Sequence, residues 1–121
     1  MKIVVAGASG FIGSRLIRYL ADIPEVETIY ALSRAARANI GSVEWRKVDL
    51  ADLTGLKLAV EGADLAIYLV HSMSPQARMS QGTFEDFDLL QADNFARACR
   101  TSGIKDIIYL GGIVQDENVE R

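Results

Sequence analysis

Three glycines at every third position follow the first apolar run of the chain, and they constrain its fold more than any other feature. Residues 4–14 read VVAGASGFIGS, with the glycines between a β-branched run and an amphipathic stretch. A strand, a glycine turn and a helix in this order open a βαβ unit, and the helix N-terminus offers unpaired N–H groups and a partial positive charge. The motif therefore predicts a phosphate-binding site where the first helix begins.

Each glycine of the motif has a separate expected role. Gly7 lets the chain turn sharply out of the strand, Gly10 lets a pyrophosphate approach the backbone, and Gly13 lets the helix pack tightly on the sheet. Ser9 can add a hydroxyl donor. The spacing is G-x-x-G-x-x-G rather than the G-x-G-x-x-G of many dehydrogenases, and a glycine-rich turn without a ligand is the alternative.

Short β-branched runs and longer amphipathic stretches alternate along the whole chain. The pattern predicts strands at residues 2–6, 28–32, 43–48, 64–70 and 105–110, and helices at 11–22, 53–60 and about 83–102. Asp52 is expected to cap the second helix, and Thr83 with Asp86 resembles a capping box at the start of the third. The segment 33–42 is short and polar, so we expect a loop or a single turn there.

Alternating strands and helices are typical of βαβ units, which form parallel sheets. With right-handed crossovers we expect an α/β fold with a doubly wound (Rossmann) parallel sheet of strand order 3-2-1-4-5, in three α/β/α layers. The 121 residues suffice for one domain and are too few for two. We therefore expect a single dinucleotide-binding domain over residues 1–121.

Composition and charge exclude several classes of function. Half of the residues are hydrophobic and 24% are charged, as in a globular domain, and the net charge of −3 argues against general affinity for nucleic acid or acidic membranes. The single cysteine, Cys99, lies in an apolar helical stretch and is expected to fill the core, and no metal site is expected. No apolar run approaches the about 18 residues of a membrane span and no signal peptide precedes the first strand, so we expect a cytoplasmic protein.

The end of the second predicted strand indicates which dinucleotide binds. Proteins that prefer NAD place an Asp or Glu there for the ribose hydroxyls. This chain reads LSRAAR at residues 32–37, with Ser33, Arg34 and Arg37 and no acid. A carboxylate would repel a 2′-phosphate, whereas a guanidinium can hold it in a fork of hydrogen bonds. The residues therefore favour NADP(H), with NAD(H) as the second choice and a solvated basic loop as the alternative.

Four segments together resemble the short-chain dehydrogenase/reductase superfamily, and within it the atypical and extended members that include NmrA-like and nucleotide-sugar-epimerase-like proteins. The segments are GASGFIG at 7–13, VDL at 48–50, DLAIYLVHSM at 64–73 and GIKDIIYLGGI at 103–113. The resemblance implies an NADP(H)-binding domain of an oxidoreductase or epimerase that acts on a small-molecule substrate. Its further implied cofactor contacts are Phe11, Ile12, Asp49, Leu50, Leu69, Val70 and His71.

The resemblance gives some of these residues specific roles. Asp49 would accept a hydrogen bond from the adenine amino group, with Leu50 beside the ring, although Asp49 can instead cap the end of its strand. His71, the only histidine, ends the fourth strand near the ribose and nicotinamide, and we expect it to be structural or close to the cofactor rather than a general base. Asp88 stands where extended members often carry an Asn, and we expect a surface or packing-linked polar contact from it.

The chain departs from the family at its catalytic residues. Members usually use a Tyr-x-x-x-Lys pair, but none of the four tyrosines here has a lysine four residues later. A partner serine usually follows the fifth strand, where this chain has Gly111 and Gly112. Members continue for at least another hundred residues, so we expect this to be the N-terminal part of a longer protein. Alternatively, the parent protein lacks the pair altogether.

Three functions therefore compete: the cofactor-binding part of an oxidoreductase or epimerase, a non-enzymatic NmrA-like redox sensor, and a structural domain without a nucleotide. The catalytic residues stay unidentified in each case. If the later strands of the family fold are absent, the fifth strand becomes an apolar edge that invites pairing with another chain. We therefore expect dimerisation or strand swapping through this edge.

Overall fold

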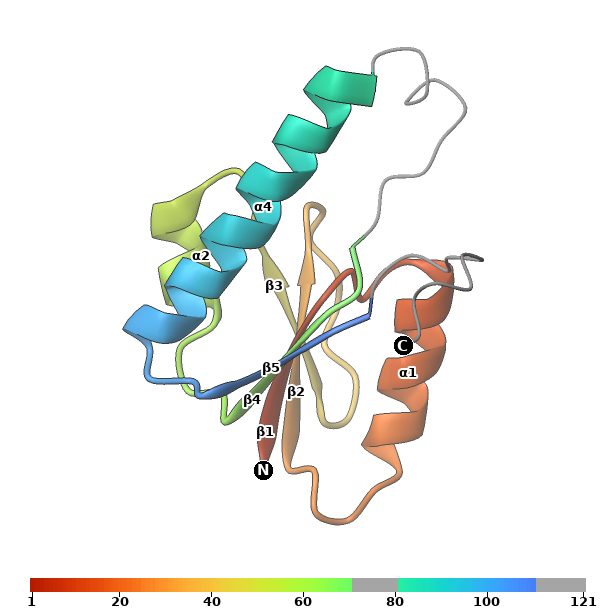
Figure 1. Ribbon diagram of the computed structural model, residues 1–121. Helices are drawn as coiled ribbons and strands as arrows, with labels where there is room; N and C mark the ends of the chain where they lie inside the picture. Colours follow the sequence, from red (N-terminus) through yellow and green to blue (C-terminus); the bar gives the residue numbers. More distant parts are fainter. Residues whose placement is uncertain (71–80, 111–121) are drawn as a thin grey trace, which may run out of the picture.

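The computed structural model of the protein describes residues 1–70 and 81–110, with side chains from residue 87 onward in the last helix, and it contains a parallel sheet between helices (Figure 1). The elements in chain order are β1 (Lys2–Ala6), α1 (Phe11–Ala21), β2 (Thr28–Ser33), β3 (Val43–Lys47), α2 (Leu53–Ala59), β4 (Leu65–Tyr68), α4 (Gln81–Thr101) and β5 (Asp106–Tyr109).

The sheet has the order β3-β2-β1-β4-β5, and every neighbouring pair of strands is parallel. This confirms the predicted doubly wound α/β fold. Strand β1 lies at the centre, where Val4 and Val5 are fully buried on opposite faces. A central parallel strand is covered on both faces, which explains why its sequence is a continuous apolar run.

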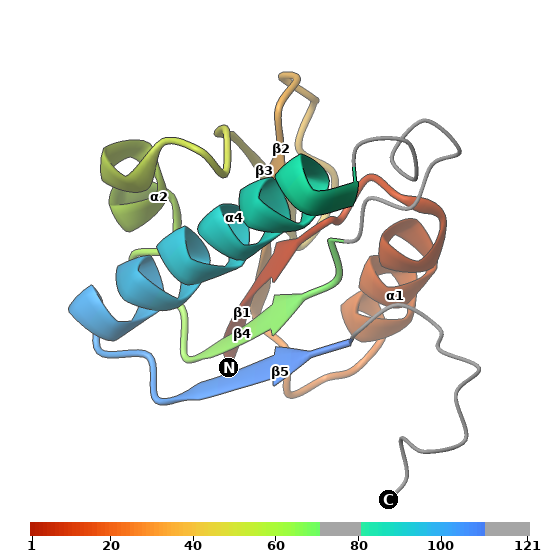
Figure 2. The same cartoon turned by 45° about the horizontal axis from the view of Figure 1, so that its top comes forward.

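Helix α1 covers one face of the sheet, and α2 and α4 cover the other (Figure 2). The core accordingly divides into two clusters. The α1-side cluster contains Ile3, Val5, Ile17, Leu20 and Ile29, among others. The α4-side cluster contains Val4, Leu32, Leu56, Phe95 and Cys99, among others. The complete burial of Cys99 confirms that it fills the core.

The helix and strand boundaries differ from the sequence-based predictions by a few residues. Helix α4 begins at Gln81, so Thr83 lies inside the helix and does not precede it. The expected capping box at Thr83 is therefore wrong, because the local pattern does not fix where the first turn of the helix begins. Asp52, in contrast, caps α2 as expected, because its Oδ1 accepts a hydrogen bond of 3.0 Å from the Gly55 amide.

The connection from β2 to β3 contains no helix, as expected from its polar sequence. It includes only an isolated antiparallel bridge between Ile40 and Val43. Within the two described segments of the chain, no helix is both long enough and apolar enough to cross a membrane.

Candidate functional site

A cleft of about 390 Å³ lies at the carboxyl ends of the strands. Its lining residues come from the loop after β1, the ends of β2 and β4, the segment after β3, and α4: Gly7, Ser9, Leu32, Ser33, Arg34, Val48, Leu50, Val70, Phe87 and Gln91. Strand β1 sits between β2 and β4, so the strand order reverses at this point. In open parallel sheets, ligands bind in the crevice outside the carboxyl ends at such a switch point.

The fold itself requires glycine at two positions of the loop after β1. Gly7 has a φ of +87°, and a Cβ there would lie 3.0 Å from the Leu69 carbonyl carbon. At Gly13 a Cβ would lie 2.0 Å from the Gly7 carbonyl oxygen and 2.8 Å from the Ala8 Cα. At Gly13, helix α1 therefore packs directly on the backbone of the loop after β1, whereas the expected contact was with the sheet.

Gly10 is different, because the protein leaves room for a side chain there. Its φ of −77° and ψ of 179° suit any residue, and among the described residues an added Cβ would approach only the Gly7 carbonyl oxygen, at 3.5 Å. The N–H groups of Phe11, Ile12 and Gly13 are the ones that an α-helix leaves without intrahelical partners. The first turn of α1 contains no acidic residue. Unpaired amides at a helix N-terminus without a carboxylate favour an anion, so the start of α1 fits a phosphate group, although Gly10 is not among the residues that line the cleft.

The end of β2 brings one of its two arginines to the cleft. Ser33 is buried and its Oγ accepts a hydrogen bond of 3.2 Å from the Ala35 amide, which turns the chain out of the strand. Arg34 is exposed and lines the cleft. The Arg37 guanidinium instead lies over the Trp45 ring, 4.9 Å from its centroid, and Arg37 is not among the lining residues.

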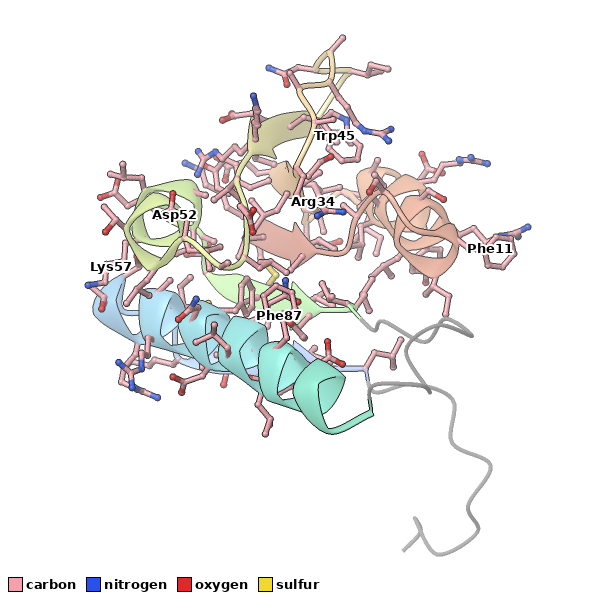
Figure 3. The ribbon with its side chains drawn as sticks, turned by 90° about the horizontal axis from the view of Figure 1, so that it is seen from above. Phe11, Arg34, Trp45, Asp52, Lys57 and Phe87 are labelled. Atoms are coloured by element: carbon pink, nitrogen blue, oxygen red, sulfur yellow. The ribbon has the colours of Figure 1, made fainter. Side chains whose placement is uncertain are left out.

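Of the remaining predicted site residues, some line the cleft and others do not. Leu50 and Val70 line the cleft, whereas Asp49 is exposed and its Oδ1 accepts a hydrogen bond of 2.9 Å from the Ala51 amide. Phe11 is 74% exposed beneath the Arg15 guanidinium and points away from the cleft (Figure 3). Ile12 is partly exposed and Leu69 is buried, and neither lines the cleft. His71 lies outside the described residues.

Sequence reasoning missed the contribution of α4. Phe87 and Gln91, four residues apart on this helix, both line the cleft. Figure 3 shows Phe87 and Arg34 on opposite sides of the carboxyl end of β1. One turn further, the buried Asn94 donates a hydrogen bond of 2.9 Å from Nδ2 to the Leu50 carbonyl oxygen. The sequence shows that residues 87, 91 and 94 share one helix face, but it does not show that this face lies against the cleft.

Tyr68, at the end of β4, is a poor candidate for acid–base chemistry. Burial, and to a smaller extent the nearby Asp88 and Tyr109, raises the pKa of its phenol from 10.0 to about 12. Its ring packs against Phe95 at 5.2 Å between centroids, and it does not line the cleft. The phenol therefore stays protonated near neutral pH. In the part of the chain that the structure describes, no group of three His, Cys, Asp or Glu side chains could hold a metal ion.

A doubly wound parallel sheet whose first glycine loop borders a cleft at the switch point defines a Rossmann-type dinucleotide-binding domain. Comparison with known families agrees with this class. The model of the NAD dependent epimerase/dehydratase family matches residues 3–116, and the chain belongs to this family.

Three curated relatives show how this family likeness extends. The auxiliary protein GraX of Staphylococcus aureus is 26% identical over 99% of this chain and 39% of its own length. A 2-alkyl-3-oxoalkanoate reductase of Stenotrophomonas maltophilia is 28% identical over 90% of this chain and 32% of its own. A UDP-glucose 4-epimerase of Mycolicibacterium smegmatis is 31% identical over 90% of this chain and 38% of its own length. The chain therefore spans between 32% and 39% of the length of these relatives.

Solved structures share the fold. The UDP-N-acetylglucosamine 4-epimerase of Bacillus cereus superposes with a TM-score of 0.73 at 26% identity, over 90% of this chain and 36% of its own. The uronate dehydrogenase of Agrobacterium tumefaciens, in a complex with NAD, superposes with a TM-score of 0.71 at 23% identity, over 91% of this chain and 40% of its own. The triphenylmethane reductase of a Citrobacter species, in a complex with NADP(H), superposes with a TM-score of 0.68 at 24% identity, over 92% of this chain and 37% of its own.

Proposed function

We propose that this chain is the NADP(H)-binding domain of an oxidoreductase or epimerase. The observation that carries the proposal is Gly10: the described residues leave room for a side chain there, and their packing gives no reason for glycine. A ligand that must reach the first-turn amides of α1 supplies that reason. The reductase and epimerase among the relatives support an enzyme more than the redox-sensor alternative.

In this proposal the pyrophosphate binds at the N-terminus of α1, with the Ser9 hydroxyl as an additional donor. The site residues Gly7, Leu50 and Val70 shape the cleft around the rest of the dinucleotide. When bound, the nicotinamide supplies hydride transfer, and the protein's part is to hold and orient it. The substrate is not assigned.

The preference for NADP(H) rests on the end of β2. Relatives of known structure include one in complex with NAD and one in complex with NADP(H), so the family supports either dinucleotide. At this position the described part of the cleft lining contributes Ser33 and Arg34 and no carboxylate. The Arg34 guanidinium can form paired hydrogen bonds with a 2′-phosphate.

Calorimetric titration with NADPH and NADH tests the proposal directly. We expect the protein to bind NADPH more tightly, and Arg34→Asp to abolish that difference because a carboxylate repels the 2′-phosphate. Arg37→Asp is the matched control, since the Arg37 guanidinium lies over Trp45 outside the cleft lining. Absence of binding to both dinucleotides would refute the function, and a preference that survives in Arg34→Asp would refute the assignment of the 2′-phosphate site.

A further inference from the structure

The outward face of α1 carries an exposed stripe of aromatic and arginine side chains, formed by Phe11, Arg15, Arg18 and Tyr19. Phe11 is 74% exposed and Tyr19 is 67% exposed. Arg15, which lies between them, holds its guanidinium 4.4 Å from the centroid of the Phe11 ring. Aromatic and arginine side chains are the types that protein interfaces favour at their centres, so the stripe has the composition of a docking surface.

The stripe also has positive charge that the described residues leave unbalanced. In the two described segments of the chain, neither Arg15 nor Arg18 forms an ion pair with a carboxylate. Between residues 11 and 22 the only acid is Asp22, at the far end of the helix. A group that matches this surface combines negative charge with apolar side chains.

The sequence directly after β5 has this combination. Residues 111–121 read GGIVQDENVER and lie outside the described part of the chain. We call residues 113–120 the acidic segment. It begins with the apolar Ile113 and Val114, its acids follow at positions 116, 117 and 120, and it contains no basic residue. Its carboxylates therefore complement the guanidinium groups of the stripe.

The topology brings the start of this segment to the edge of the sheet where α1 begins. Strands β1 and β5 are both parallel to β4, so the chain leaves both of them at the carboxyl edge. The described end of β5 lies on the side of α1 in Figures 1 and 2. Two strand spacings, roughly 10 Å, separate β1 from β5, whereas eleven extended residues span up to about 36 Å. The segment can therefore reach α1 and run along its length of about 16 Å.

We propose that the acidic segment docks along the outward face of α1. The order of side chains agrees in the two elements. Counted from the carboxyl edge, Phe11 comes first on α1 and the arginines follow, and in the acidic segment Ile113 comes first and the carboxylates follow. The apolar residues then cover the Phe11 ring while the carboxylates pair with the guanidinium groups. None of the stripe residues is among the described residues that line the cleft, so the inference is independent of the proposed function.

Zero-length cross-linking of the whole chain tests the proposal, because a carbodiimide joins an amine to a carboxylate that it contacts. Arg18→Lys keeps the charge of the stripe and supplies the amine. We expect mass spectrometry to find a cross-link within one chain from position 18 to a carboxylate at 116, 117 or 120. Lys57, exposed on α2 and on the opposite side of the molecule from Phe11 in Figure 3, is the internal control and should form none with the acidic segment.

Charge reversal supplies a second measurement. The amide NMR signal of Val119 should shift in Arg15→Glu/Arg18→Glu, because the carboxylates are then repelled. Adding Asp116→Lys/Glu117→Lys should move it back towards its wild-type position. Lys57→Glu is the matched control and should leave it in place. Thermal unfolding of each variant checks that the fold is retained.

Definite results would overturn the proposal. One is the absence of a cross-link from position 18 to the acidic segment. Another is a cross-link found only between chains that carry different isotope labels, which would show that a second copy occupies the surface. A Val119 signal that ignores the reversal on α1, or that moves as far in Lys57→Glu, would equally refute docking on the stripe.

Discussion

Replacing Gly13 with alanine should destabilise the fold, and the structure sets the size of the effect. The added Cβ would lie 2.0 Å from the Gly7 carbonyl oxygen, about 1.4 Å closer than the 3.4 Å at which ordinary contact begins. The obstructing atoms belong to the backbone of Gly7 and Ala8, so no side-chain rotation relieves the overlap. Helix α1 must therefore move away from the sheet, and it carries Ile17 and Leu20 of the α1-side cluster with it.

Two opposing contributions determine the net change in free energy. Overpacking of this kind costs about 3 kcal/mol, the upper end of the usual range, because backbone has to shift. Alanine is a better helix former than glycine by about 1 kcal/mol, which offsets part of the cost. We expect the free energy of unfolding to fall by about 2 kcal/mol, which corresponds to a urea midpoint lower by about 1 M.

Gly10→Ala is the matched variant for the same loop. Its Cβ would approach only one atom of the described residues, at 3.5 Å, so stability should change by less than about 0.5 kcal/mol. In the proposed function it should nevertheless lose most of its affinity for NADPH, because the methyl group occupies the approach to the α1 amides. Wild-type stability in Gly13→Ala would refute the packing argument. Wild-type NADPH affinity in Gly10→Ala would refute the pyrophosphate site.

Three further predictions concern parts of the molecule away from the glycine loop. The pKa of Tyr68 is about 12 in the folded protein and 10.0 as a free side chain, so its contribution to stability should be complete below pH 10 and should disappear as the pH rises towards 12. Urea unfolding at pH 8 to 11 should show the start of this loss of stability. Tyr68→Phe should make the loss smaller. Asp52→Ala should lower the free energy of unfolding by about 1 kcal/mol through loss of the bond to the Gly55 amide, and Asp52→Asn should retain most of it in the same urea assay. Strand β5 pairs only with β4 among the described strands and half-exposes Ile108, so sedimentation velocity should find a dimer that Ile108→Lys converts to monomer; a wild-type monomer at high concentration would contradict this.

The strands and their order could be predicted from the sequence because local patterns determine them. Each central strand is an apolar run buried on both faces, and the glycine motif identifies which run comes first in a βαβ unit. The right-handed crossover rule then leaves few possible orders. Asp52 was equally predictable, since a cap is a contact over three residues.

The composition of the cleft wall could not be predicted in the same way. Phe87 and Gln91 belong to a helix whose spacing is plain in the sequence, but which strand ends that helix faces depends on how α4 packs across the sheet. Arg34 and Arg37 look equivalent in the sequence, and only the pairing of β2 with β3 brings Trp45 under Arg37. These distinctions come from contacts between distant segments, which local patterns do not encode.

The division of the interior into two clusters has a consequence for how the domain opens. Among the described residues the two clusters have no buried residue in common, so each helical layer can loosen from the sheet while the other stays packed. The cleft, however, takes Ser9 from the segment that leads into α1 and Phe87 from α4. A dinucleotide bound there would contact both helical layers, so its binding should slow amide hydrogen exchange in α1 and in α4 by the same factor. That factor depends on the dinucleotide concentration relative to its Kd.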